Sequence, residues 1–179
     1  MKKVALIALV FGLASAGVFA ATPSTPWTWQ LQAGYSGSSK WMDSGWMTGT
    51  GVGYQFTDNF KLNFDLNYYE GKIKDSGQKD HIWAFYAAPQ YTYHLSDNDQ
   101  VYGFVGVGVA DRQSKTYDAG TLGRIHVPGE SKFAWEGGFG YNHFFNKNLG
   151  LNLQATYSRM NFTDRVSPVD GRVGIVVRF

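Results

Sequence analysis

The sequence alternates between apolar and polar side chains over most of its length. Between Phe60 and Tyr69, apolar residues occupy the parity that runs from Phe60 to Tyr68, and mostly polar residues occupy the other. Successive side chains of a β-strand point to opposite faces, so this pattern predicts a strand with one apolar face and one polar face. The apolar face is buried in a soluble protein, whereas it faces lipid in a barrel that spans a membrane.

Similar alternation between turn-forming residues predicts eight strands. They cover residues 27–36, 46–56, 60–69, 82–94, 101–110, 132–143, 149–158 and 171–179. Short connections alternate with long ones, the longest being residues 111–131, as they do in an up-and-down barrel with turns at one rim and loops at the other. We therefore predict an all-β fold, an eight-stranded antiparallel up-and-down transmembrane β-barrel over residues 27–179.

Aromatic residues of the apolar parity are sorted by height in these strands. If odd-numbered strands run away from the short turns, the aromatics form two groups with aliphatic side chains between them. We expect two aromatic girdles at the lipid–water interfaces, where Trp and Tyr rings have one wet end. The girdles include Trp29, Phe60, Tyr93 and Tyr141 near the turns, and Trp46, Tyr68, Trp83, Trp135 and Tyr157 near the loops.

The polar parity combines glycines with charges of both signs, which is typical of the interior of a small barrel. Its glycines leave room for large side chains opposite them. They are Gly34, Gly51, Gly53, Gly106, Gly108, Gly138, Gly140 and Gly174. Charges in a confined lumen need partners, so we predict a polar cluster with Asp65, Glu136 and Arg172 near mid-height. Lys61 and Arg178 complete the predicted cluster.

One residue departs from this strand pattern. Pro89 lies on the lipid-facing parity of the fourth predicted strand. Proline has no backbone N–H, so it removes a donor from a sheet that should have no edge. We expect a local bulge at this position.

The amino-terminal residues predict a signal peptide over residues 1–20. Lys2 and Lys3 precede an apolar run, and small residues precede Ala20. A retained membrane anchor is the alternative, but the run is short for a spanning helix. A short lead-in over residues 21–26 follows. Removing the two lysines leaves 14 basic and 14 acidic side chains, because the whole chain has 16 and 14, so the charge gives no reason to expect a nucleic-acid partner.

Three segments carry a resemblance to a known group of proteins. They are the strand VYGFVGVGVA, the hairpin WEGGFGYNHFFNKNLGLNLQATYS and the terminal strand GRVGIVVRF. They resemble the small eight-stranded outer-membrane barrels of Gram-negative bacteria, the group of the OmpA transmembrane domain and OmpX. The resemblance implies a protein of the cell outer membrane. The terminal Phe179 is similar to the signal that the barrel-assembly machinery reads.

The pattern leaves several functions open. We expect a monomeric structural or surface-interaction protein whose long loops contact lipopolysaccharide or a host ligand, because loop lysines and arginines can bind lipid phosphates. A narrow ion or small-solute pore, gated by Glu136 with Arg172 or Lys61, is the first alternative. A lipid-modifying enzyme that uses Ser131 and His126 is a more distant one. A secreted lipocalin-like barrel shares the strand count but must point its apolar side chains inward.

Known site chemistries find little support in the sequence. The absence of cysteine excludes disulfides and thiolate metal sites. The four histidines stand apart from one another, and metal sites need converging ligands. Glycine runs such as GTGVGY lack the helix that a phosphate-binding loop must open. We expect no enzyme activity, no cofactor and no metal site.

Overall fold

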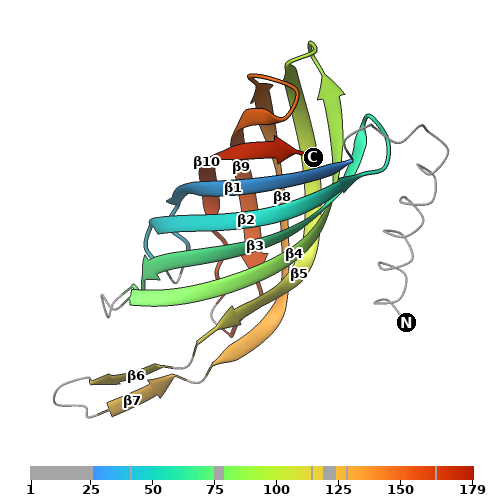
Figure 1. The fold of residues 1–179 in the computed structure, drawn as a ribbon. Coiled ribbons are helices and arrows are strands. Elements are labelled where there is room, and N and C mark those ends of the chain that lie inside the picture. The colour runs from blue at the N-terminus through green and yellow to red at the C-terminus, as the bar shows by residue number, and fades with distance from the viewer. Residues whose placement is uncertain are drawn as a thin grey trace, which may run out of the picture.

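The computed structural model is a closed barrel of eight antiparallel strands (Figure 1), which confirms the predicted fold. It describes residues 26–40, 42–74, 79–113, 115–118, 124–127, 129–163 and 165–179. The barrel strands are β1 (Trp27–Ser36), β2 (Gly45–Gln55), β3 (Phe60–Lys72), β4 (Lys79–His94), β5 (Asp99–Arg112), β8 (Glu130–Phe144), β9 (Leu149–Met160) and β10 (Val169–Arg178). Among the described residues, no helix is long and apolar enough to cross a membrane.

The barrel closes by pairing its first and last strands. The strand order is β1-β10-β9-β8-β5-β4-β3-β2, and β1 also pairs with β2. Trp29 lies opposite Val177, and the backbone amides of Trp27 and Phe179 each donate to the other residue's carbonyl oxygen, at 3.2 and 3.0 Å. The closure leaves no exposed sheet edge along the barrel wall.

Short turns close the end of the barrel at which β1 begins and β10 ends. We name this end the turn end. The short turns cover residues 56–59, 95–98 and 145–148. Thr57, Ser96 and Asn146 each use a side-chain oxygen to accept the backbone amides two and three residues further on. Such local hydrogen bonds explain why polar tripeptides turn the chain here. The longer connections lie at the opposite end, which we name the loop end.

The strands extend further at the loop end than the sequence predicts. β3 continues to Lys72, β5 to Arg112, and β8 begins at Glu130. The segment 111–131, predicted to be an irregular loop, also contains a second hairpin. Its strands β6 (Lys115–Asp118) and β7 (Arg124–Val127) pair only with each other, and Figure 1 shows them projecting beyond the barrel. Both parities are polar in these extensions, so the alternation that predicts a strand fades there.

The bulge predicted at Pro89 is wrong. Between β4 and β5, Ala87 pairs with Val107 and Gln90 pairs with Phe104, so the register is the same on both sides of the proline. The ladder is interrupted between these pairs without an inserted residue. The missing N–H of Pro89 therefore interrupts pairing with β5, while pairing with Leu62 of β3 continues.

The polar parity faces the interior, as the strand pattern predicts. In β3, Asn63 and Asp65 are 5% and 6% exposed, whereas Phe64 and Leu66 are 46% and 41% exposed. The other barrel strands keep this alternation over most of their length. The apolar side chains therefore form the outer wall, which excludes the inward-facing apolar core of a lipocalin-like barrel.

Candidate functional site

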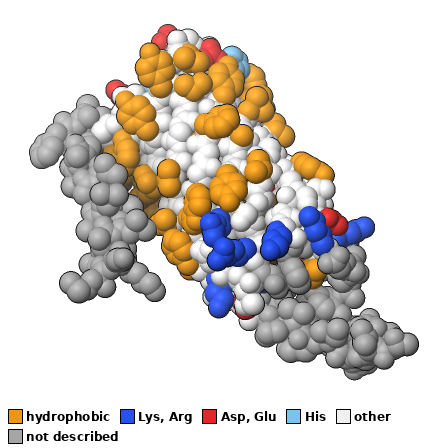
Figure 2. Space-filling model, turned by 180° about the vertical axis from the view of Figure 1, so that it is seen from behind, with side chains coloured by type: hydrophobic (Ala, Val, Ile, Leu, Met, Phe, Trp, Pro, Cys, Tyr) orange, Lys and Arg blue, Asp and Glu red, His pale blue; other side chains and the backbone are white. Residues whose placement is uncertain are grey.

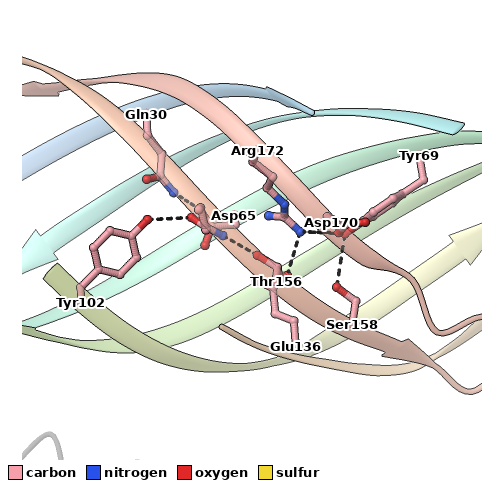
Figure 3. Close-up of polar contacts among 10 residues, drawn as sticks. Gln30, Asp65, Tyr69, Tyr102, Glu136, Thr156, Ser158, Asp170 and Arg172 are labelled. Carbon is pink, nitrogen blue, oxygen red and sulfur yellow. Dashed lines mark hydrogen bonds and ion pairs between the residues drawn. The ribbon is translucent and has the colours of Figure 1, made fainter. Parts of the chain in front are cut away.

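Arg172 of β10 is the centre of a charged network inside the barrel (Figure 3). Its Nη2 donates to the hydroxyl of Tyr69 and to Oδ2 of Asp170, both at 3.0 Å, and lies 3.5 Å from Oε2 of Glu136. The side chains of Arg172, Glu136 and Asp170 are at most 1% exposed. Tyr69 also lies 3.4 Å from the hydroxyl oxygen of Ser158. This network joins β3, β8, β9 and β10.

The register of the strands and a glycine make room for this network. Asp170 and Arg172 share a face because they are two residues apart on β10. Glu136 lies opposite Gly106 of β5. A Cβ atom at Gly106 would lie 3.1 Å from Cγ of Glu136 and 3.1 Å from the Cβ of Ala88. The lack of a side chain at Gly106 therefore leaves room for the Glu136 side chain.

A second network of neutral polar side chains continues toward the turn end. Gln154 accepts from the hydroxyl of Tyr102 at 2.9 Å and donates to Thr156 at 2.8 Å. Asn152 donates to Tyr102 at 2.7 Å. Beside this network, Asp65 accepts a 2.7 Å hydrogen bond from Gln30, and the two side chains meet over Gly51 of the intervening strand β2 (Figure 3). We name the charged and neutral networks together the polar region.

The structure brings together only some of the predicted cluster. Glu136 and Arg172 form an ion pair, whereas Asp65 is bonded to Gln30. Lys61 and Arg178 lie nearer the turn end and line a small cavity of about 10 Å³, room for about one water molecule. Arg178 donates to Gln100 at 2.9 Å, and its guanidinium carbon lies 3.5 Å from the ring centre of Phe144. No ion pair therefore joins these two cations to the charges at mid-height in the described chain.

The loop end of the interior is mostly apolar, apart from a buried Asp80–Arg112 ion pair, so the expectation of a polar lumen holds only in part there. We name this part the apolar region. It is a cluster of buried side chains: Met42, Met47, Tyr69, Ile82, Ala84, Tyr86, Ala110, Ala134, Met160, Phe162 and Val166. Met42, Phe162 and Val166 come from connections outside the barrel strands. These connections close the barrel over the interior, and in such a covered space apolar side chains are favoured over unpaired polar ones.

Sequence reasoning missed several interior residues because it ended the strands early. The predicted strand 171–179 leaves out Asp170, although Asp170 has the parity of Arg172. The predicted strands 82–94 and 101–110 leave out Asp80 and Arg112, yet these residues form a buried ion pair with 2.6 Å between Nε and Oδ2. Extending the alternation two residues beyond each predicted end would have found all three. Tyr69 was assigned to the polar parity, but nothing in the sequence pointed to Arg172 as its partner.

The predicted aromatic girdle residues all face outward. Trp46, Tyr68 and Trp83 form a contact group at the loop end, with ring centres 5.5 and 4.8 Å apart, and Trp135 lies 5.5 Å from Tyr157. Seen from behind, the wall carries many apolar side chains, and lysines and arginines gather at one end of that face (Figure 2). The remaining girdle residues are Trp29, Phe60, Tyr93 and Tyr141, none of which is buried.

The described side chains offer little for catalysis or metal binding. Ser131 donates to Asp111, and the side chain of His126 lies outside the described residues. His143 Nδ1 lies 2.8 Å from Asp99 near the turn end. Within the described ranges, no group of three or more His, Asp or Glu residues is arranged to hold a metal ion.

A closed eight-stranded barrel with an apolar outer wall and a polar interior defines a transmembrane β-barrel protein. The family model described as "Outer membrane protein beta-barrel domain" matches residues 6–179, so the chain belongs to this family. Its membership indicates a protein of the Gram-negative outer membrane. No curated protein matches the sequence.

Solved structures share the fold at low sequence identity. Neisserial surface protein A is 14% identical, with 86% of this chain and 96% of that chain covered and a TM-score of 0.67. The N-terminal barrel domain of Pseudomonas aeruginosa OprF is 13% identical, with 87% and 98% covered and a TM-score of 0.54. Yersinia pestis Ail, in complex with the heparin analogue sucrose octasulfate, is 15% identical, with 86% and 99% covered and a TM-score of 0.54. These likenesses establish the fold alone.

Proposed function

We propose that the protein is a closed outer-membrane barrel that acts at the cell surface through its loop end. The observation that carries the proposal is the extension of β5 and β8, which continue past the barrel and lead to the β6–β7 hairpin. In outer-membrane barrels the long connections face outward and the short turns face the periplasm. The hairpin is then the part of the molecule best placed to reach a ligand outside the cell.

The interior supports a structural rather than a conducting role. The polar region fills the middle of the barrel with bonded side chains, and the apolar region covers its loop end. Ions avoid apolar constrictions because they lose their hydration there. A barrel that is closed in this way interacts with other molecules mainly through its surface, and not through its interior.

Basic loop residues suggest the chemistry of the outer ligand. Lys115 and Arg124 belong to the hairpin, and Lys132 lies on the outer extension of β8. A barrel of the same fold, Ail, has been solved with a sulfated heparin analogue. Lysine and arginine side chains bind sulfate and phosphate groups, so we propose a polyanionic ligand such as a host glycan or lipopolysaccharide.

The test replaces residues 115–127 by a short Gly-Ser turn in cells that display the protein. We expect wild-type cells to attach to immobilised heparin, and cells with the shortened hairpin to lose that attachment. The matched control replaces residues 145–148 at the turn end by a Gly-Ser turn. Heat-dependent mobility on gels checks that both variants fold. Equal attachment by the shortened variant, or no attachment by wild-type cells, would refute this role.

A narrow pore is the second function that an observation favours. Neither carboxylate oxygen of Glu136 accepts a hydrogen bond in the described chain, and its ion pair with Arg172 is long at 3.5 Å. A loosely held carboxylate can exchange partners. In planar bilayers the closed-barrel proposal expects a silent membrane, whereas a stable conductance that changes in Glu136→Ala would support the pore.

Three further proposals concern enzyme activity, assembly, and oligomeric state with lipid contact. The family consists mostly of proteins without enzyme activity, so we propose that this one is not an enzyme. We propose that Phe179, whose side chain is 60% exposed, is read by the barrel-assembly machinery during insertion. We also propose a monomer that needs no cofactor and contacts outer-membrane lipid. Lipid modification by the purified protein, abolished by His126→Ala, would instead support an enzyme.

A further inference from the structure

Two arginines lie close together along the backbone on the outward face of the loop end. Met160 of β9 forms a bridge with Val166, and both side chains are fully buried in the apolar region. Alternation then turns Arg159 and Arg165, the residues just before them, to the outward face. In antiparallel pairing around this bridge the two arginines are diagonal neighbours, a separation of roughly 7–8 Å between backbones that long side chains easily span.

Aromatic neighbours set these arginines at the level of the membrane interface. Arg159 lies directly opposite Trp135 of β8, and Trp135 packs against Tyr157 with ring centres 5.5 Å apart. Phe133, also outward, is 49% exposed. Trp and Tyr rings favour the boundary between hydrocarbon and headgroups, so the guanidinium of Arg159 lies where lipid headgroups begin.

The charge of this pair is not neutralised within the described part of the chain. Neither Arg159 nor Arg165 makes an ion pair there, and the nearby carboxylate of Glu130 already accepts from the hydroxyl and amide of Thr163, at 2.6 and 3.1 Å. Two other cations at the loop end are paired: Lys79 lies 2.7 Å from Glu70, and Arg112 lies 2.6 Å from Asp80. Among the described residues, one side of the loop-end rim therefore carries positive charge without an anionic partner.

We propose that Arg159 and Arg165 bind a phosphate group of an outer-leaflet lipid, with Trp135 and Tyr157 packed against its acyl chains. The guanidinium group forms paired hydrogen bonds with phosphate, which suits a fixed headgroup. The inference rests on the proposed function in one respect, the orientation of the barrel: the loop end must face the outer leaflet of the membrane. It assigns lipid recognition to one side of the barrel, separate from the hairpin.

The experiment measures lipid retention by native mass spectrometry of the refolded full chain. The probes are bisphosphorylated lipid A and the same lipid without phosphate. We expect wild-type protein to retain the phosphorylated form at least about tenfold better, as charge-assisted hydrogen bonds require. R159Q/R165Q should lose this preference, whereas the control K72Q/K147Q, which removes two cations elsewhere, should keep it.

Three results would overturn the site. They are no preference in wild type, equal loss in the control variant, and complete displacement of the lipid by millimolar inorganic phosphate, which would indicate a free-phosphate site. Heat-dependent mobility confirms that each variant is folded. The shortened-hairpin variant retains both arginines, so loss of heparin attachment with intact lipid preference separates the hairpin role from this site. If the lipid preference alone fails, the hairpin role stands.

Discussion

The polar and apolar regions of the interior solve the same packing problem by different means. Both fill a space walled by the same strands: β3, for instance, contributes Asp65 to one and Tyr69 to both. In the polar region the side chains depend on particular partners, through hydrogen bonds or, for Glu136, through an ion pair with Arg172. In the apolar region the side chains need only to exclude water and fill volume.

This difference predicts how each region responds to change. A buried ion-pair network is sensitive to the loss of one partner, because the remaining charges stay buried without compensation. An apolar cluster that contains Met42, Met47 and Met160 tolerates changes of shape, because the unbranched Met side chain adapts to irregular space. Chemical identity therefore matters most in the polar region, and volume matters most in the apolar region.

The largest effect is expected from Arg172→Met. The substitution removes the cation that lies between Glu136 and Asp170 and leaves both carboxylates buried. We expect the free energy of unfolding to fall by about 3–5 kcal/mol. Urea titration of the refolded protein in lipid vesicles measures this loss. The matched control is Arg178→Met near the turn end, where the charge is only partly buried and a smaller loss is expected. Equal losses at the two positions would contradict the network.

A smaller loss in the free energy of unfolding is expected when a polar side chain of the polar region is replaced by an apolar one of similar size. Gln154→Met deprives the Tyr102 hydroxyl of its acceptor and Thr156 of its donor. We expect this change to lower the free energy of unfolding by about 1–3 kcal/mol. Met47→Leu in the apolar region should cost less than about 1.5 kcal/mol, because it conserves volume. The same urea titration compares them. If Met47→Leu proves the more damaging, the contrast between the regions is wrong.

The sequence predicted the barrel because a membrane imposes regular alternation on every spanning strand. It placed Glu136 and Arg172 at one height, since parity and turn position together fix height. It did not predict that Arg172 would also bind Tyr69 and Asp170, because such contacts depend on which strands face each other across the lumen. The apolar region was also missed, although Met47 and Ile82 lie on the inward parity. Lumen polarity was treated as uniform, whereas the covering connections change it near the loop end.

The smallest effect is expected from a pair of hydrogen bonds between Glu130 and Thr163, which we name the clamp. They hold the connection that covers the apolar region. Beyond the loop-end aromatics, Thr163 donates its hydroxyl and its amide to Glu130, next to Phe162 in the covering connection. These hydrogen bonds hold the pKa of Glu130 below its ordinary value, with Lys132 and Arg112 acting in the same direction. A depressed pKa in the folded state means that the clamp stabilises the fold above the unfolded pKa, and that this contribution is lost as pH falls through the folded pKa.

The amide resonance of Thr163 reports this titration directly. In wild-type protein we expect its chemical shift to move with a midpoint below the ordinary pKa of a glutamate, and Glu130→Gln should abolish the movement. Because Glu130 is only partly buried, the variant should unfold at nearly the wild-type urea concentration, with faster hydrogen exchange confined to residues 161–163. A midpoint at or above the ordinary glutamate value would show that the two hydrogen bonds do not persist in solution. Faster exchange that spreads to Gln154 and Arg172 would show instead that the polar and apolar regions do not respond independently.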